Sequence, residues 1–363
     1  MKNINKNLKI LQMMDEPWDS GLTASALRLS SMLSKTGQDT TILAPFDSFA
    51  HKQALRSGLP VITYRAPWLL SLPLIIEDIN RLGINMLHAH TGSMHTLAWI
   101  ASYFIENARI IRTRGEQRSS KTNPLYSLIL GRTDWLVFPT EHLQRMFLAD
   151  NMSWKKIAKV IYPGFSNPAS ANGAPSPDSS RIIVTMVGRL DPIKGPWDFL
   201  DAAALTASKF PKAEFYMAGE EKNVKKSDLI AYSKKLKLKN KVTITGYLSA
   251  NDLNDLMART DIAVIASQGS EVISRVCLEW MSMGKPIVAT RVGMITEILE
   301  HGVNAFLANT NSPQEVYEHI SALAKSSSRR KAVGQKARQT YMQSYSPEIF
   351  TANYKELYAH SSS

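Results

Sequence analysis

The 363 residues of the chain include a single cysteine, Cys277. This excludes an intrachain disulfide bond and a zinc site built from several cysteines. Long apolar runs are also missing, because the longest, residues 68–76, is interrupted by Ser71 and Pro73 and is far shorter than the ~20 residues of a membrane-spanning helix. The first residues lack the apolar core of a signal peptide. We therefore expect a soluble protein of the cytoplasm.

Positive charge predominates, because 43 Lys and Arg residues stand against 31 Asp and Glu residues and give a formal net charge of +12. An excess of this size favours anionic partners, such as nucleotide phosphates, nucleic acid or an anionic membrane face. The basic residues are spread over both halves of the chain, with no basic tail and no arginine-rich recognition helix. Nucleic acid is therefore the weaker candidate, and we expect no binding to it.

The length and the hydrophobic pattern indicate an α/β protein with two domains. At ~100–200 residues per domain, 363 residues are enough for two. Short β-branched apolar runs alternate with longer segments of helical period, which is typical of parallel sheets whose strands are joined by helices. A helix is predicted at residues 23–35. Strands are predicted at residues 8–13, 40–43, 61–64, 86–90, 110–113, 135–139, 182–187, 214–217, 242–245, 262–266 and 287–290.

Residues 163–180 are rich in Pro, Gly, Ser and Asn, which is the composition of a linker. This segment predicts an N-terminal domain over residues 1–165 and a C-terminal domain over residues 166–345. Residues 346–363 contain a further predicted helix, which can return to the N-terminal domain and whose aromatic residues we interpret as docking side chains. Ligands of doubly wound sheets bind outside the carboxyl ends of the strands, so site residues are expected in the turns there.

The first candidate site follows the predicted strand 182–187 and has the sequence Gly188-Arg-Leu-Asp-Pro-Ile-Lys-Gly. Gly188 permits a turn that a side chain would obstruct. Arg189 and Lys194 then stand at the carboxyl edge of the sheet, and both side chains suit phosphate oxygens. Two solvated loop charges would explain the same spacing.

The second candidate site has two carboxylates, Glu271 and Glu279, on either side of a predicted helix start. Ser274 can cap this helix, whose first N–H groups would face an anion. Glu279 could then accept the hydroxyls of a ribose, and Glu271 those of a sugar beyond the phosphates. The alternative is an ordinary pair between Glu279 and Arg275, four residues apart, with Glu271 as a loop charge.

These segments resemble the retaining glycosyltransferases of the GT-B fold, specifically family 4 (glycosyltransferase group 1), of the bacterial lipopolysaccharide and capsule type. The resemblance rests on VGRLDPIKG and the paired-glutamate segment, with AEFYMAGE, VTITGYLS and ARTDIAVIAS in order between them. It covers the C-terminal domain, whereas the N-terminal domain matches more loosely. It implies two Rossmann-like, doubly wound parallel-sheet domains that face each other across a cleft.

The resemblance also implies roles for individual residues. Arg189 and Lys194 would hold the diphosphate and offset charge on the departing nucleotide. Glu271 would bind hydroxyls of the donor sugar, and Glu279 the ribose. The remaining residues expected to surround the nucleotide sugar are Gly188, the backbone of Ile273, Ser274, Arg275 and Val276, and, around the base, Gly246, Tyr247 and Leu248.

The sequence departs from the family pattern at three positions. Val272 and Ser274 stand where glycines are common, which reduces the backbone freedom for a close approach to the donor. Ser20 replaces one of two adjacent glycines in the loop 19–23, whose Gly21 is expected to approach the donor phosphates.

Several polar residues of the N-terminal domain are candidates for the acceptor side. His88 and His90 end a predicted strand, and a histidine there can orient a hydroxyl group, although a structural histidine explains it equally well. Arg114, Glu116 and Arg118 follow the next strand, and Arg114 corresponds best to a histidine that many relatives carry near the reacting sugar. This charge could bind an acidic or phosphorylated acceptor, and a solvated loop is the alternative.

No Asp-x-Asp motif lies where it would place a metal ion at the phosphates, so we expect neither a metal nor a cofactor. The expected donor is a UDP-, GDP- or ADP-linked sugar, and the expected acceptor is a hydroxyl of a glycan or of a lipid-linked molecule. An epimerase or phosphorylase of the same fold would use the same nucleotide or phosphate site. A nucleic-acid-binding protein without enzymatic activity is the alternative from another class.

The apolar stretch at residues 68–76 has two interpretations. With Arg56, Arg65 and Arg81 nearby, it could lie on the anionic inner face of the cytoplasmic membrane as a peripheral contact. An ordinary helix buried in the domain explains the apolar residues equally well.

Overall fold

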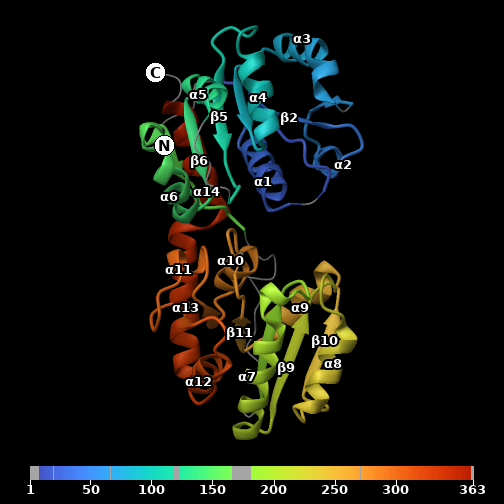
Figure 1. Ribbon diagram of the computed structural model, residues 1–363, viewed down its shortest axis with the longest axis vertical. Coiled ribbons are helices and arrows are strands. Elements are labelled where there is room, and N and C mark those ends of the chain that lie inside the picture. The colour runs from blue at the N-terminus through green and yellow to red at the C-terminus, as the bar shows by residue number, and fades with distance from the viewer. Residues whose placement is uncertain are drawn as a thin grey trace. The chain divides into compact units, whose positions relative to one another are not determined.

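The computed structural model describes residues 8–18, 20–65, 67–117, 123–165, 181–269 and 271–360. The chain divides into two compact units. The first unit consists of Met1–Gly164 together with Pro347–Ser363, and the second unit is Phe165–Ser346. Each unit is a parallel sheet with helices packed on it (Figure 1). Most of the predicted linker, residues 166–180, lies outside the described residues.

The first unit contains a parallel sheet of seven strands in the order β3-β2-β1-β4-β5-β6-β7. The chain runs outward from β1 to β3 and then returns to place β4 beside β1, which makes the reversal of strand order typical of a doubly wound sheet. The strands are β1 (Ile10–Met13), β2 (Thr40–Pro45), β3 (Val61–Tyr64), β4 (Met86–Ala89), β5 (Arg109–Thr113), β6 (Trp135–Phe138) and β7 (Ala158–Val160).

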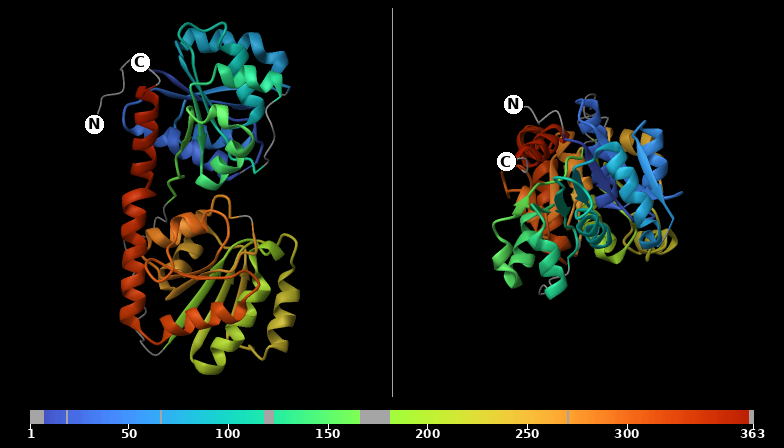
Figure 2. Two further views of the ribbon diagram at one scale, coloured as in Figure 1. Left: turned by 60° about the vertical axis from the view of Figure 1, so that its left-hand side comes forward. Right: turned by 90° about the horizontal axis from the view of Figure 1, so that it is seen from above.

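Helices cover both faces of this sheet. Successive residues of β1 point to opposite faces, and all of them are buried. Leu11 packs in a cluster with residues of α3 (Leu72–Leu82) and α4 (Gly92–Ala101). Ile10 packs in another cluster with residues of α1 (Gly21–Lys35) and α14 (Pro347–His360), the blue and dark red helices of Figure 2. The helices of the first unit also include α1 (Gly21–Lys35), α2 (Phe49–Arg56), α5 (Pro124–Gly131), α6 (Glu141–Asp150), α14 (Pro347–His360) and the short helices η1 (Trp68–Ser71) and η2 (Met152–Trp154).

The second unit contains a parallel sheet of six strands in the order β10-β9-β8-β11-β12-β13. Its strands are β8 (Ile182–Val187), β9 (Ala213–Ala218), β10 (Val242–Gly246), β11 (Ile262–Ile265), β12 (Ile287–Thr290) and β13 (Phe306–Ala308). Its helices are η4 (Pro192–Lys194), α7 (Pro196–Lys209), α8 (Lys226–Lys235), α9 (Ala250–Arg259), α10 (Arg275–Ser282), α11 (Ile295–Ile298), α12 (Pro313–Ala324) and α13 (Ser327–Ser344).

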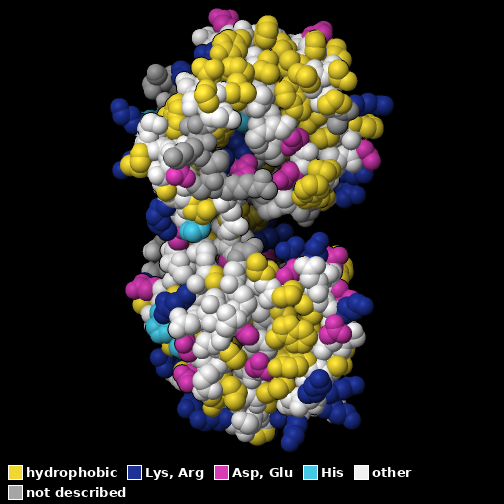
Figure 3. Space-filling model, viewed as in Figure 1, with side chains coloured by type: hydrophobic (Ala, Val, Ile, Leu, Met, Phe, Trp, Pro, Cys, Tyr) yellow, Lys and Arg dark blue, Asp and Glu magenta, His cyan; other side chains and the backbone are white. Residues whose placement is uncertain are grey.

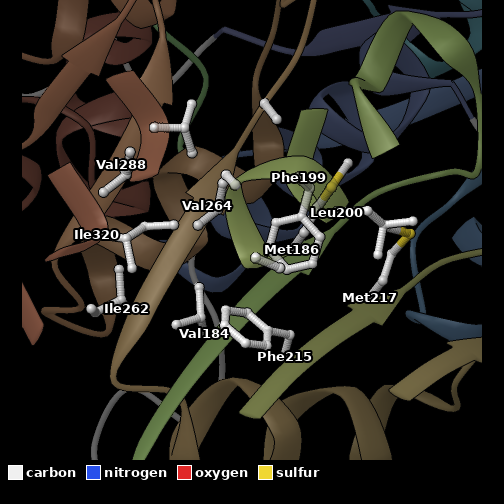
Figure 4. Packing of buried hydrophobic residues seen from close by; sticks show 14 of the residues in the cluster. Val184, Met186, Phe199, Leu200, Phe215, Met217, Ile262, Val264, Val288 and Ile320 are labelled. Atoms are coloured by element: carbon white, nitrogen blue, oxygen red, sulfur yellow. The ribbon is translucent and has the colours of Figure 1, made fainter. Parts of the chain in front are cut away.

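The core of the second unit forms where α7 and α12 pack on the sheet. Phe199 of α7 and Phe215 of β9 meet edge to face, with ring centroids 6.4 Å apart. Val184 and Met186 of β8 lie in the same buried cluster, shown in Figure 4. The central strand β8 is thereby held in place, and the loop after it starts from a fixed point.

The predicted α/β class with two doubly wound parallel sheets is confirmed. Eleven of the observed strands overlap strands predicted from the sequence, whereas β7 and β13 were missed because three residues are too few to show an alternating pattern. In the part of the chain that the structure describes, no helix is both long and apolar enough to cross a membrane.

Candidate functional site

The loops that follow β8 and β11 meet at the carboxyl edge of the second sheet. β8 and β11 are neighbouring parallel strands, so the loops after them emerge side by side. Lys194, which ends η4, donates from Nζ to Oε1 of Glu271 at 2.5 Å. Ser267 donates from Oγ to the same oxygen at 2.5 Å. Two of the predicted site residues, 77 positions apart in the sequence, are therefore in direct contact.

Both side chains of this ion pair are largely buried, so the loss of either one would leave the other charge without compensation. The Glu271 side chain is 2% exposed and that of Lys194 is 19% exposed, so each charge depends on the other for compensation. Both hydrogen bonds end on Oε1, and among the described residues no donor reaches Oε2. Oε2 is thus the oxygen with capacity to accept from a ligand. Ser267 was not predicted as a site residue, although its place directly after a predicted strand was a signal for it.

Arg189 supplies a second cation at this edge of the sheet. Its side chain is exposed and forms no ion pair with any residue in the described ranges. The loop that carries it is fixed by Asp191, whose two carboxylate oxygens accept from the Ile193 backbone N–H at 3.0 Å and the Asn223 amide at 2.8 Å. The charge of Arg189 is therefore available to an anion from a well-anchored loop.

Two glycines allow the loops to approach this closely. Gly195 has a φ of +68°, and a Cβ there would lie 1.9 Å from the carbonyl oxygen of Ala266. Gly293 has a φ of +49°, and a Cβ there would lie 2.4 Å from the carbonyl oxygen of Glu271. Both positions require left-handed backbone and the absence of a side chain. The backbone of Glu271 thus lies close to Gly293, and the backbone of Ala266 lies close to Gly195.

Gly195→Ala should destabilise the second unit more than a glycine substitution without a steric conflict. A left-handed alanine costs roughly 1–2 kcal/mol by itself, and the clash with Ala266 adds to this cost. Gly302→Ala is the matched control, because Gly302 has a φ of +79° and nothing within 4 Å of its missing Cβ. Urea unfolding of both variants measures the difference. Equal losses in free energy of unfolding would show that the two loops can move apart without cost.

The helix α10 differs from the prediction in its capping. Ser274 occupies the N-cap position as expected, but its hydroxyl makes no capping hydrogen bond. Its backbone, with φ −93° and ψ 82°, departs from the extended geometry of a capping serine, and Oγ is buried without a hydrogen-bond partner among the described residues. The expected capping bond was wrong. The segment Ile273–Val276 therefore starts α10 with its first N–H groups free of a serine cap.

Glu279 lies on α10 beside a cation. Arg275 donates from Nε to Oε1 of Glu279 at 2.8 Å, which is the ordinary pair that the sequence left open as an alternative. The Glu279 side chain is 12% exposed and that of Arg275 is 56% exposed. The pair does not exclude a further contact of Glu279 with a ligand hydroxyl, because a carboxylate has about four acceptor positions. The ribose role of Glu279 stays a prediction.

The segment expected around the base lies at the end of β10, on the same edge of the sheet as Lys194. Gly246 ends the strand with a φ of +76°. Tyr247 follows with 77% of its surface exposed, and Leu248 is half-buried. An exposed aromatic ring at this edge offers a face for stacking.

The three histidines near the carboxyl edge of the first sheet are buried. Burial lowers the pKa of His90 to about 3 and that of His88 well below its usual value, and the nearby charge of Arg112 adds to both shifts. Burial also lowers the pKa of His95 to about 3, again with Arg112 contributing. His88 bonds to Tyr358 and Thr113 through its two ring nitrogens, so it is a satisfied structural histidine.

The charges after β5 are arranged around one buried arginine. Arg112, in β5, is 1% exposed and pairs with Glu116. Arg114 lies 3.9 Å from the other oxygen of Glu116 and stacks its guanidinium over the Phe147 ring at 5.2 Å. Arg114 and Glu116 thus interact within the unit, and their role toward an acceptor stays a prediction. Arg118 lies outside the described residues.

The start of α1 carries a negative charge beside Gly21. Ser20 caps the helix by accepting from the backbone N–H of Thr23 at 3.0 Å. The Glu16 carboxylate accepts from the hydroxyls of both Ser20 and Thr23. A carboxylate at this place opposes the binding of a phosphate there. The expected approach of Gly21 to donor phosphates stays a prediction.

Across the described ranges, no group of three or more His, Cys, Asp or Glu side chains is placed to hold a metal ion.

Solved structures with low sequence identity to this chain have the same fold of two doubly wound units. The UDP complex of Anabaena Alr3699/HepE is 20% identical, with a TM-score of 0.81 over 97% of this chain and 100% of that chain. A glycosyltransferase from Rickettsia africae is 19% identical, with a TM-score of 0.81 over 98% of both chains. The lipopolysaccharide outer core galactosyltransferase WaaB in its apo form has a TM-score of 0.73 at 13% identity, over 96% of this chain and 98% of that chain. The fold is GT-B.

Sequence comparisons show similarity between the second unit and a family of enzymes. Residues 172–340 match the model of the glycosyl transferases group 1. Spore coat protein SA of Bacillus subtilis is 30% identical over 164 residues, which are 44% of this chain and 43% of that protein. A D-inositol 3-phosphate glycosyltransferase of Segniliparus rotundus is 24% identical over 72% of this chain and 57% of its own length. The chain thus spans about half the length of these curated relatives. Residues 172–340 are thus similar to the glycosyl transferases group 1.

Proposed function

We propose that the chain is a retaining, metal-independent glycosyltransferase of family 4. It transfers a sugar from a nucleotide-diphosphate sugar to a hydroxyl of a glycan or lipid-linked acceptor, in the synthesis of a bacterial cell-surface polysaccharide or lipopolysaccharide. The contact between Lys194 and Glu271 carries this proposal, because it joins a phosphate-binding cation to a carboxylate with one oxygen left for sugar hydroxyls.

The donor binds at the carboxyl edge of the second sheet in this proposal. Lys194 and Arg189 receive the diphosphate, and the N–H groups at the start of α10 add further donors. Oε2 of Glu271 accepts from the sugar, Glu279 from the ribose, and Tyr247 stacks on the base. Glu271 orients the sugar as a hydrogen-bond acceptor in this proposal.

Charge on the leaving diphosphate is neutralised by the protein in this proposal. Arg189 and Lys194 lie where that charge develops, and cations held in place before the reaction stabilise it without rearranging. Transfer takes place on the face of the sugar from which the nucleotide leaves. The acceptor hydroxyl passes its proton to the departing phosphate oxygen, a new glycosidic bond forms, and the configuration at the anomeric carbon is retained.

The acceptor binds at the carboxyl edge of the first sheet. His90 lies there, and within the described residues one of its two ring nitrogens is hydrogen-bonded, to Gln12. Arg114, Glu116 and Arg118 are the candidates for contacting a polar or phosphorylated acceptor. The net charge of this group favours an acceptor with an acidic substituent.

The test is a screen of UDP-, GDP- and ADP-sugars by thermal shift, followed by product analysis with glycan and lipid-linked acceptors. UDP-glucose is the first donor to use, because HepE has been solved with UDP and with UDP-glucose. A stabilising donor raises the melting temperature, and NMR of the product gives the anomeric configuration. An epimerised donor without acceptor, or release of a sugar phosphate with inorganic phosphate, would instead indicate the alternatives on this fold.

The same proposal places the first unit on the anionic inner face of the cytoplasmic membrane. Ile75 and Ile79 of α3 are buried, as expected for an ordinary helix. The residues just before and within α3 are not: Leu69 is 60%, Leu70 80% and Leu74 66% exposed. Figure 3 shows the hydrophobic area around α3 on the first unit. The area includes Tyr103 and Phe104, which are exposed and held beside α3 by a hydrogen bond from Asn80 to the Phe104 carbonyl.

An anionic bilayer suits this surface because its leucines and aromatic rings are flanked by exposed Arg65 and Arg81 on a chain with a net charge of +12. Leu70→Glu combined with Leu74→Glu should abolish flotation with vesicles that contain phosphatidylglycerol. Met342→Glu is the control, because Met342 is 51% exposed in the second unit. Flotation of the double variant at the wild-type level would remove this surface from the proposal.

A further inference from the structure

Two exposed aromatic rings lie at the carboxyl edge of the first sheet. Trp18, in the loop after β1, is 63% exposed, and Phe46, directly after β2, is 57% exposed. β1 and β2 are neighbouring parallel strands, so the loops after them emerge side by side at the edge where ligands of doubly wound sheets bind. Aromatic rings that stay exposed at such an edge are candidates for contact with a ligand.

Backbone hydrogen bonds hold the two loops together. The N–H of Phe49, at the start of α2, donates at 3.2 Å to the carbonyl of Pro17, the residue before Trp18. The N–H of Phe46 donates at 2.8 Å to the carbonyl of Tyr64, at the end of β3. Both rings are therefore carried by backbone that is held in place before a ligand binds, which lowers the entropic cost of binding.

The Trp18 side chain has unused contact surface. Among the described residues, no aromatic ring or cation lies against its indole, and its Nε1–H has no hydrogen-bond partner. Phe46 is partly occupied, because the centroid of the His51 ring lies 5.4 Å from its own and the Arg65 guanidinium lies 5.6 Å from its centre. Trp18 is therefore the ring that can receive a ligand, and Phe46 adds apolar surface in the neighbouring loop.

Two acidic side chains, Asp15 and Glu16, lie in the same loop after β1. Glu16 accepts from the hydroxyls of Ser20 and Thr23 through Oε2, and no donor among the described residues reaches its Oε1. Asp15 makes no hydrogen bond or ion pair with a described residue, and its charge adds to burial in raising the pKa of Tyr64. Both carboxyl groups thus keep acceptor positions for the hydroxyls of a ligand.

An aromatic face with carboxyl oxygens beside it fits the ring of an uncharged sugar. A pyranose has a face of C–H groups, which stacks on an aromatic ring, and a rim of hydroxyls, which donate to carboxyl oxygens. A phosphorylated or carboxylated sugar is disfavoured, because it would meet two acidic side chains. An anionic bilayer is disfavoured here for the same reason.

We infer that Trp18 is a stacking platform for an uncharged sugar ring of the acceptor, with Asp15 and Glu16 accepting hydrogen bonds from the hydroxyls of that sugar. This inference rests on the proposed function, which places the acceptor at this edge of the first sheet. The platform follows β1, and β4 separates it from β5, which precedes Arg114. It therefore contacts a different part of the acceptor from any acidic substituent bound at Arg114.

The contact is measured without turnover by ¹⁹F NMR of the whole protein labelled with fluorinated tryptophan. The chain has 7 tryptophans, and the Trp18 signal is the one missing from Trp18→Phe. Disaccharides that end in glucose, galactose, mannose or N-acetylglucosamine are the probes. We expect at least one of them to shift the Trp18 signal and to leave that of Trp68 unchanged, because Trp68 packs against a core cluster and donates to Ser93. A Trp18 signal that responds to none of these sugars, or to UDP alone, would overturn the inference.

Trp18→Ala should raise KM for the acceptor on the order of tenfold, because the loss of one well-packed aromatic contact corresponds to about that factor. kcat and KM for the donor should keep their wild-type values, because the ring binds the acceptor and takes no part in the chemistry. Trp18→Phe should recover part of the affinity, since a stacking face remains.

Tyr103→Ala is the matched control in an assay with a water-soluble acceptor. Tyr103 is also 63% exposed, but it lies beyond the end of α4, away from the loops after β1 and β2. A wild-type acceptor KM in folded Trp18→Ala, or equal increases in Trp18→Ala and Tyr103→Ala, would overturn the inference and leave the proposed transfer standing. Absence of transfer with every donor would refute the proposed function, whereas a shift of the Trp18 signal with a sugar would still support Trp18 as a sugar-binding residue.

Discussion

Lys194→Ala is expected to lower kcat for sugar transfer by on the order of 100-fold or more. The ammonium group is held at the place where charge develops on the leaving diphosphate, and removal of one such preorganised group has an effect of this size. The loss should appear mainly in kcat, because the contact strengthens as the bond to the phosphate breaks. Steady-state kinetics with the donor identified by thermal shift measures it.

Stability has to be separated from catalysis in this experiment. Removing Lys194 leaves Glu271, which is 2% exposed, with Ser267 as its remaining partner, and an uncompensated buried charge costs about 3–5 kcal/mol. Adding Glu271→Gln to Lys194→Ala removes that charge and should restore stability but not turnover. Lys222→Ala is the control, because Lys222 is exposed in a loop on the same edge of the sheet. Wild-type kcat in a folded Lys194→Ala would contradict the proposed mechanism.

Lowering the pH from 7.5 to 5 should destabilise the first unit by about 4 kcal/mol through His90 and His95. Burial and the charge of Arg112 lower both pKa values from 6.5 to about 3, so the unfolded chain takes up protons below pH 6.5 that the folded unit does not. The stabilisation that comes from these two lowered pKa values is therefore fully present above pH 6.5 and is lost as the pH falls toward 3. At pH 5 the loss of stability is about 2 kcal/mol for each histidine, because one pKa unit corresponds to ~1.36 kcal/mol. His88 adds to the loss in the same direction.

Urea unfolding at the two pH values, followed by circular dichroism, measures this loss. His95→Gln should flatten the pH dependence, because it removes one of the titrating rings. His360→Gln should leave it unchanged, since His360 is exposed at the end of α14. A free energy of unfolding that is the same at pH 5 and pH 7.5 would mean that the folded rings take up protons as readily as the unfolded ones.

The strands and their order along the chain could be predicted because a buried parallel strand needs a run of apolar residues. The runs at residues 61–64, 182–187 and 287–290 coincide with β3, β8 and β12. The same principle placed Arg189, Lys194 and Glu271 near the carboxyl ends of strands. Which of these side chains touch could not be predicted, because the contact between Lys194 and Glu271 depends on the packing of β8 beside β11.

Side chains whose environment depends on distant segments were misjudged or left open. Ser274 stands at the predicted N-cap, but among the described residues its buried hydroxyl makes no hydrogen bond. Tyr358 was interpreted as a docking side chain, and only the fold shows that its hydroxyl lies 2.8 Å from His88, 270 positions away in the sequence. No local sequence pattern indicates that the hydroxyl of Tyr358 contacts His88, or that Ser274 makes no capping hydrogen bond.

The sequence by itself determined the two doubly wound sheets and the edge of each sheet where polar residues gather, because hydrophobic periodicity and turn composition act over a few neighbouring residues. Only the tertiary structure decided which charges are compensated, which histidine nitrogens are engaged and which leucines stay exposed. These properties depend on burial and on contacts between residues far apart in the chain. A pattern of residue types does not contain that information until the chain has folded.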